Sequence, residues 1–192
     1  VEADGKRFIL SNNHVLANQN ALPIGSAIYQ PGLLDKNAPA SDAIATLAKF
    51  IPLATDHPNQ VDCAIAEITE DKLVSPAVMP KVGKLKSGQP LAAALSMKVE
   101  KTGRTTGYTA GTIHDISANV KVGYDIGPLT FSDQLIIVGR TASFSDAGDS
   151  GSLIVDQTTK RPVGLLFGGS TNTTIANHIE DVLNQLKVNI VA

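Results

Sequence analysis

The sequence predicts an all-β fold, because short apolar runs of strand length recur along it and no long helical repeat alternates with them. Gly, Pro, Asn and Asp separate these runs at roughly the spacing expected of β-sandwiches and barrels, which disfavours a parallel sheet built from βαβ units. The predicted strands lie at residues 7–10, 26–29, 49–53, 61–68, 109–116, 134–138, 152–155 and 162–167.

One helix is predicted, near the C-terminal end. Its apolar residues follow the i, i+3, i+4, i+7 rule and should dock on the body of the domain: Ile179, Val182, Leu183 and Leu186. Residues 31–58, richer in Pro, Ala and Asp, indicate an irregular excursion with one short strand around Phe50. The polar segment 81–90 indicates a linker, so residues 1–80 would form a first β-barrel and residues 91–192 a second.

Composition excludes several classes of function. The 192-residue chain has 16 basic and 18 acidic residues, no basic cluster and no Trp, so nothing favours nucleic-acid binding. No apolar run is long enough to span a bilayer, and the first residues lack the pattern of a signal peptide, so we expect no membrane partner and leave the compartment open. Cys63 is the only cysteine, so an internal disulfide is excluded.

The strongest local signal is the segment 144–152, FSDAGDSGS. A nucleophilic serine needs its hydroxyl on a tight turn with backbone N–H groups beside it, and Gly148 and Gly151 on either side of Asp149 and Ser150 permit such a turn. Gly, Asp and Ser also dominate ordinary surface turns. By itself the segment therefore favours neither interpretation.

Two further segments favour catalysis. His14 follows an apolar strand in SNNHVL, and Asp62 begins another in VDCAIAEI, so the chain order is His, Asp, Ser. This is the chymotrypsin order and not that of subtilisin or the α/β-hydrolases, and Ser152 also breaks the hydrolase G-x-S-x-G elbow. His57 lies close to Asp62, but in a loop, and is interpreted as solvated. No His or Cys pair has metal-ligand spacing, so neither a metal nor another cofactor is predicted.

Four segments together resemble the trypsin-like, chymotrypsin-fold serine peptidases of bacteria. SNNHVL resembles the His segment of HtrA-type proteases, VDCAIAEI the Asp strand and GDSGS the nucleophile loop, while GRTTGYTAGTI at residues 103–113 resembles the strand opening the second barrel of α-lytic-type proteases. The resemblance implies two six-stranded antiparallel β-barrels with the active site between them and a C-terminal helix. Only 13 residues precede His14, so the first barrel is expected to lack its N-terminal strand, which an N-terminal segment or another chain would supply.

The resemblance also assigns roles. His14 would take the proton of Ser150 and return it to the leaving amine, while Asp62 would fix the His14 tautomer. The N–H groups of Gly148 and Ser150 would form the oxyanion hole. Arg104 would form a largely buried ion pair with Asp149.

Residues 162–170 resemble the strand on which a peptide substrate lies as an added antiparallel strand, with Phe167 standing where the family usually has Ser, and Gly168 and Gly169 leaving the backbone open. The specificity pocket should be lined by Phe144, Ser145, Leu166 and Thr174, which favours a small or medium apolar residue before the cleaved bond.

The predicted function is therefore a serine endopeptidase acting on a peptide or protein substrate. Two alternatives remain open: a catalytically silent peptidase-fold module that binds peptides, and an esterase with the same triad.

Overall fold

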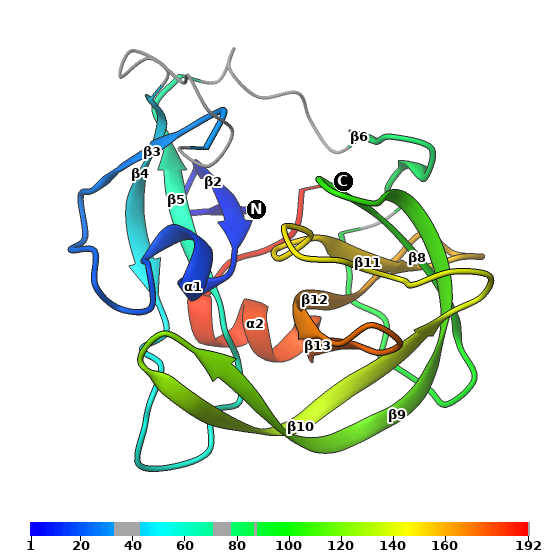
Figure 1. The fold of residues 1–192 in the computed structure, drawn as a ribbon. Coiled ribbons are helices and arrows are strands. Elements are labelled where there is room, and N and C mark those ends of the chain that lie inside the picture. The colour runs from blue at the N-terminus through cyan, green and yellow to red at the C-terminus, as the bar shows by residue number, and fades with distance from the viewer. Residues whose placement is uncertain (33–42, 71–77, 87, 192) are drawn as a thin grey trace.

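The computed structural model describes residues 1–32, 43–70, 78–86 and 88–191, in which two antiparallel β units are packed side by side with a C-terminal helix (Figure 1). The strands are β1 Glu2–Ala3, β2 Lys6–Ser11, β3 Ala27–Tyr29, β4 Ala43–Phe50, β5 Ala64–Ile68, β6 Val78–Met79, β7 Gly83–Lys84, β8 Lys98–Gly103, β9 Gly107–Tyr124, β10 Gly127–Gly139, β11 Leu153–Asp156, β12 Pro162–Gly169 and β13 Thr174–His178. The helices are α1 Asn13–Leu16 and α2 Ile179–Leu186. The predicted all-β class is confirmed.

The first unit is a five-stranded antiparallel sheet in the order β1-β2-β5-β4-β3. Its core is made of small and medium side chains, with Ala45 and Leu47 from β4 packed against Ala64 and Ala66 from β5 and against Leu16 after β2. Among the described residues this unit is an open sheet, and its first strand is only two residues long. The backbone of Glu2 in β1 also exchanges two hydrogen bonds with Asn189.

The second unit is a closed six-stranded barrel in the order β10-β13-β12-β11-β8-β9. Apolar side chains that alternate along its strands fill the interior, and these include Val99, Ile113, Leu135, Ile137 and Ile154. Closure leaves no unpaired strand edge in this unit, so the barrel is a firm support for the loops at its rim.

The C-terminal helix α2 connects the cores of the two units. All four residues of the predicted stripe are buried, and they pack with Cys63 and Ile65 near the first sheet and with Leu165 of the barrel. Lys49 of β4 donates hydrogen bonds from Nζ to the carbonyl oxygens of Gln185 and Leu186, at 2.7 and 3.0 Å. These contacts place a positive charge on free carbonyls at the helix C-terminus, where the helix dipole favours it.

The hairpin formed by β9 and β10 is much longer than predicted. The two strands span 18 and 13 residues, whereas the sequence indicated only residues 109–116 and 134–138. The hairpin turns at residues 125–126, and Gly127, which begins β10, has φ of 109°. It extends from the barrel beneath the first unit, and its tip lies below α1 (Figure 1). There Phe131 forms a backbone bridge to Asn59 of the first unit.

Two other expectations need correction, and a third lies partly outside the described residues. The strand predicted at 49–53 is the end of the eight-residue β4, whose alanines have weak strand propensity but fit a tightly packed sheet. The rest of the predicted excursion includes residues 33–42, which lie outside the described part of the chain. Residues 103–113 are not one strand, because residues 104–106 form the turn between β8 and β9.

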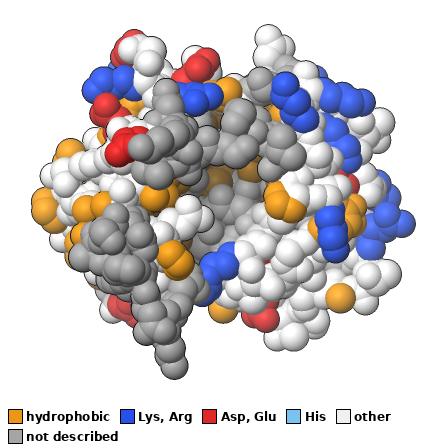
Figure 2. All heavy atoms as spheres, turned by 90° about the horizontal axis from the view of Figure 1, so that it is seen from above, with side chains coloured by type: hydrophobic (Ala, Val, Ile, Leu, Met, Phe, Trp, Pro, Cys, Tyr) orange, Lys and Arg blue, Asp and Glu red, His pale blue; other side chains and the backbone are white. Residues whose placement is uncertain are grey.

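The described chain shows no helix long and apolar enough to cross a membrane. On the face seen in Figure 2, Lys and Arg side chains gather over the side of the molecule that carries the second barrel.

Candidate active site

His14 and Asp62 are brought together at the edge of the first sheet. His14 is on the one-turn helix α1, after β2, and not on the strand itself. Asp62 lies two residues before β5, which begins at Ala64 and not at residue 61 as predicted. Nδ1 of His14 lies 2.5 Å from Oδ2 of Asp62, and the backbone N–H of His14 donates to Oδ1 at 3.2 Å. The Asp62 side chain is fully buried and that of His14 is 23% exposed. The carboxylate can therefore fix the tautomer that presents Nε2 as a base.

The buried carboxylate is placed by polar residues from several elements. The side-chain amide of Asn12 donates to the carbonyl of Asp62 at 2.8 Å, and the Asp62 N–H donates to Oδ1 of Asn177 on β13 at 3.0 Å. The hydroxyl of Tyr124, at the end of β9, donates to Oδ2 of Asp62 at 2.7 Å. Residues of both units thus hold this aspartate.

Ser150 lies on the loop before β11, against the strand that leads to His14. A Cβ on Gly151 would lie 2.2 Å from Oγ of Ser11, so only glycine allows this close approach, and Gly151 has φ of 84°. Among the contacts of the described residues, no hydrogen bond joins Oγ of Ser150 to His14. Such contacts are often long in free enzymes and shorten when substrate binds.

The loop that carries Ser150 has two backbone N–H groups without acceptors among the described residues. The amide of Ala147 donates to Oδ1 of Asp146 and that of Asp149 to the Asp146 carbonyl, whereas the amides of Gly148 and Ser150 have no acceptor in the described part of the chain. Gly148 has φ of 96°, and a Cβ there would meet Oγ1 of Thr105 at 2.5 Å. Both amides are therefore available to an external acceptor, and their assignment to an oxyanion hole stays a prediction.

The expected buried pair between Arg104 and Asp149 is wrong, because Asp149 pairs with Lys101. Nζ of Lys101 lies 3.0 Å from Oδ2 of Asp149 and both side chains are fully buried, while Arg104 is exposed in the turn after β8. Lys101 is on β8 itself and points into the barrel. The turn contributes backbone donors instead, since the amides of Thr105 and Thr106 both bond Oδ1 of Asp149.

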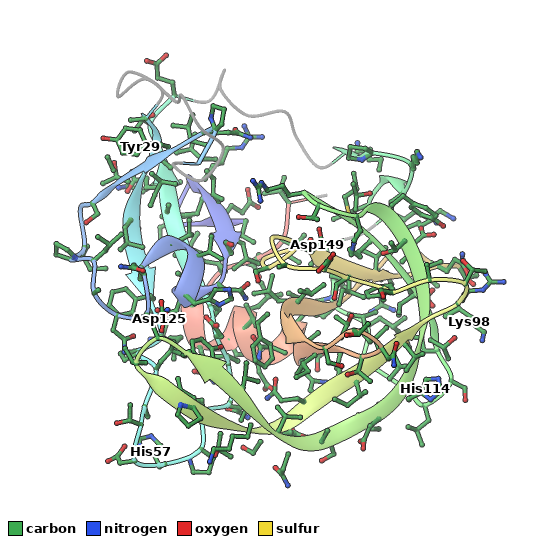
Figure 3. The ribbon with its side chains drawn as sticks, in the orientation of Figure 1. Tyr29, His57, Lys98, His114, Asp125 and Asp149 are labelled. Atoms are coloured by element: carbon green, nitrogen blue, oxygen red, sulfur yellow. The ribbon has the colours of Figure 1, made fainter. Side chains whose placement is uncertain are left out.

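Hydrogen bonding governs the ionisation of this pair. Burial by itself raises the pKa of Asp149, but donors from Thr106, Lys101 and the Thr105 amide outweigh it and lower the pKa below its usual value. Burial lowers the pKa of Lys101, and Asp149 opposes that shift. Figure 3 shows Asp149 near the centre of the view, beside β11 of the second barrel.

A pocket of about 360 Å³ lies beside Ser150. Four predicted substrate-binding residues line it, namely Ser145, Leu166, Gly168 and Gly169, together with Ser143, Asp146, Ala147, Ser170 and Thr171, which were not predicted.

The other three predicted residues do not line this pocket. Phe144 is buried in the barrel core, with its ring 5.7 Å from Nζ of Lys101. Thr174 is buried behind the pocket and shares a 2.6 Å hydrogen bond with Ser145. Phe167 turns its ring away to pack on Phe131, with ring centroids 4.7 Å apart.

The remaining His and Cys residues lie outside this arrangement. His57 is exposed, and its Nδ1 lies 2.7 Å from the carboxylate of the neighbouring Asp56. Figure 3 shows His57 and His114 at the periphery. Cys63 is buried, as predicted, and burial raises the pKa of its thiol, so it is inert. Among the described residues, no three His, Cys, Asp or Glu side chains group as metal ligands.

Sequence reasoning missed Tyr124 and Lys101. A usable signal existed for Tyr124, because Val120, Val122 and Tyr124 alternate with polar residues up to a turn containing Gly127, a pattern typical of a hairpin. No such signal existed for Lys101, because a single lysine in the polar sequence KVEKTG is expected to be exposed.

Comparison with protein families gives a match to the Nal1 C-terminal domain over residues 50–181. The chain belongs to the Nal1 C-terminal domain family. In this Nal1 C-terminal domain, the matched region includes Asp62, Tyr124 and Ser150 and begins after His14. Protein NARROW LEAF 1 of Oryza sativa subsp. japonica is 33% identical over 87 residues, which are 43% of this chain and 15% of that relative.

Solved structures agree on the fold of this Nal1 C-terminal domain. Protease A of Thermobifida fusca superimposes with a TM-score of 0.66 at 19% identity, covering 98% of this chain and 86% of that one. Nocardiopsis protease gives 0.66 at 17%, covering 100% and 89%. The active form of the Rv3671c protease of M. tuberculosis gives 0.58 at 19%, covering 94% and 68%. The fold is that of the bacterial trypsin-like serine proteases.

Proposed function

We propose that this domain is a serine endopeptidase that cleaves peptide bonds through an acyl-enzyme. The observation that carries the proposal is the buried carboxylate of Asp62, which lies against Nδ1 of His14. Near this pair is the loop of Ser150, on which the amides of Gly148 and of Ser150 itself have no acceptor among the described residues. A buried acid, a base oriented by it and a serine on an amide-rich turn are the parts that activate a hydroxyl as a nucleophile.

In this mechanism Nε2 of His14 accepts the proton of Ser150 as Oγ bonds to the substrate carbonyl carbon. The carbonyl oxygen becomes an oxyanion and receives hydrogen bonds from the amides of Gly148 and Ser150. His14 then gives its proton to the leaving amine as the C–N bond breaks, leaving the acyl-enzyme. A water molecule, deprotonated by His14, hydrolyses the ester and frees Ser150.

The backbone beyond Leu166 offers a place for the peptide. Strand β11 pairs with β12 up to Leu165, and Leu166 bonds the backbone of Gly151 and Ser152, so residues 167–169 have no neighbour on that edge in the described chain. An extended peptide could add there as an antiparallel strand and place one side chain in the pocket beside Ser150. A small or medium apolar side chain at that position stays a prediction.

Covalent capture tests the proposal. An alkyl fluorophosphonate should add one phosphonyl mass to the protein, because only an activated serine displaces fluoride, and Ser150→Ala should abolish the addition. His14→Ala should also abolish it, and His57→Ala, the matched histidine control, should label like the wild type. Labelling that survives Ser150→Ala would contradict the proposal.

One observation favours the alternative of a silent peptide-binding module, namely the missing hydrogen bond between His14 and Ser150. Under that alternative the protein would bind peptides in the groove but would not react with the fluorophosphonate. Comparison of a peptide library with simple esters separates the endopeptidase from an esterase, because an esterase would leave the peptides intact.

A further inference from the structure

Tyr124 makes a contact that the triad itself does not require. Its hydroxyl donates to Oδ2 of Asp62 at 2.7 Å, and this is the same oxygen that lies 2.5 Å from Nδ1 of His14. Among the described residues, Oδ1 receives only the longer bond from the backbone of His14. A fully buried carboxylate needs donors for its charge, and the tyrosine supplies one at the oxygen that faces the base.

The tyrosine is suited to act as a donor. Burial raises the pKa of Tyr124, and the charge of Asp62 and the hydrogen bond to Asp62 raise this pKa further. The hydroxyl therefore stays protonated at any pH at which the site would be active. Its ring is fixed on two sides. It meets His14 edge-on, with centroids 5.8 Å apart, and stacks on Phe131 at 5.9 Å.

A second contact fixes the hairpin that carries Tyr124. Gln19, in the loop after α1, donates to Oδ2 of Asp125 at 2.8 Å and accepts from the amides of Asp125 and Ile126. Figure 3 shows Asp125 at the hairpin tip, below α1. Gln19 is at the centre of three successive residues with positive φ, of 47°, 56° and 71°. The loop therefore keeps an unfavourable backbone conformation while it holds the hairpin tip.

We propose that Tyr124 is a positioning residue, which holds the carboxylate of Asp62 in the orientation that directs Oδ2 at His14. This inference rests on the proposed function, because it assigns a partner to the acid of the same triad. Its consequence is that the second barrel controls the base of the first unit through the β9–β10 hairpin. If the hairpin moved away from the first unit, Asp62 would lose the Tyr124 hydroxyl as a hydrogen-bond donor. His14 would then lose its fixed orientation.

The direct test is Tyr124→Phe, which removes the hydroxyl and keeps the ring. A hydrogen bond to a charged group is typically strong enough that we expect kcat to fall roughly 10- to 100-fold. KM should change less than about twofold, since no substrate contact is lost. Tyr108→Phe is the matched control, because Tyr108 also donates to a carboxylate, that of Glu100 at 2.9 Å, outside the site.

Two readouts separate positioning from a loss of stability. In an Asp62→Asn background Tyr124→Phe should cost little further activity, because the hydroxyl acts through the carboxylate; a purely structural role would give the same loss in both backgrounds. The far-downfield proton resonance of the His14–Asp62 hydrogen bond should shift or broaden in Tyr124→Phe and stay unchanged in Tyr108→Phe.

Failure of the proposed function and failure of the positioning role of Tyr124 would give different results. A wild-type protein that neither labels nor hydrolyses peptides would refute the proposed function, and the proton resonance would then decide the positioning role alone. An active wild type, with unchanged kcat and an unchanged resonance in Tyr124→Phe, would overturn the inference and leave the proposed function intact.

Discussion

At the scale of residues, Asp149 is held by a lysine inside the barrel and by the turn between β8 and β9. Removal of one partner of a buried ion pair leaves an uncompensated charge and costs about 3 to 5 kcal/mol. We therefore expect Lys101→Met to lower the free energy of unfolding by about that amount, measured by urea denaturation. Its matched control, Arg104→Met, alters an exposed residue and should cost about 1 kcal/mol or less.

A larger loss in Arg104→Met than in Lys101→Met would contradict this assignment. It would mean that the turn arginine carries the charge balance of Asp149, as the sequence had indicated.

The lowered pKa of Asp149 makes stability depend on pH. The folded-state pKa lies below that of the unfolded chain, about 3.9, so the stabilisation is fully present above that value and is lost as pH falls through the folded-state pKa. The difference in unfolding free energy between wild type and Asp149→Asn should therefore be constant near pH 6 and narrow below about pH 4. A difference that stays constant down to pH 2 would show that the Asp149 carboxylate does not titrate differently in the folded state.

At the scale of elements, the long β9–β10 hairpin links the two β units through Gln19. Gln19→Ala removes the bonds that hold the tip, so the amides of Asp125 and Ile126 should exchange with solvent at least about tenfold faster. Peptidase kcat should fall several-fold, and less than in Tyr124→Phe, because the rest of the hairpin stays paired. Hydrogen exchange measured by mass spectrometry reports the first effect. Unchanged exchange at the tip would contradict the linking role.

The sequence allowed prediction of the elements whose pattern is local. The strand before His14, the strand after Asp62 and the stripe of α2 each follow from a short apolar period, and they occur where they were predicted. The hairpin was underestimated because residues 117–133 mix Val and Phe with Lys, Asn and Asp, as strands with one solvated face do.

The candidate site was predictable only in part, because only some of its residues belong to a local sequence pattern. Residues with a characteristic motif, such as His14 and Ser150, can be located from their neighbours in sequence. Residues recruited by tertiary structure, such as Tyr124 and Lys101, are identified only when distant strands are brought together. Phe144 and Phe167 were placed at the pocket by their position in a motif, but apolar burial turned their rings into the core.

At the scale of the whole molecule, the candidate site lies between two units of different construction. The open first sheet carries His14 and Asp62 at its edge, and the closed barrel carries Ser150, the two amides that lack acceptors in the described chain, and the pocket. Helix α2, the β9–β10 hairpin and Asn177 each make contacts that join the two units. The relative placement of the two units therefore depends on buried contacts from both of them. Under the proposed function, the catalytic group would be assembled from residues up to 136 positions apart in the chain, from His14 to Ser150.

The most direct test of this account compares kcat/KM for peptide hydrolysis in Ser150→Ala, His14→Ala and the double variant. Residues that act as a unit give strongly non-additive losses. Each single variant should therefore lose several orders of magnitude in kcat/KM, and the double variant should lose no more than the more severely impaired single variant. His57→Ala should retain wild-type activity. Additive losses, or near-wild-type hydrolysis by Ser150→Ala, would contradict the claim that His14, Asp62 and Ser150 form one catalytic unit.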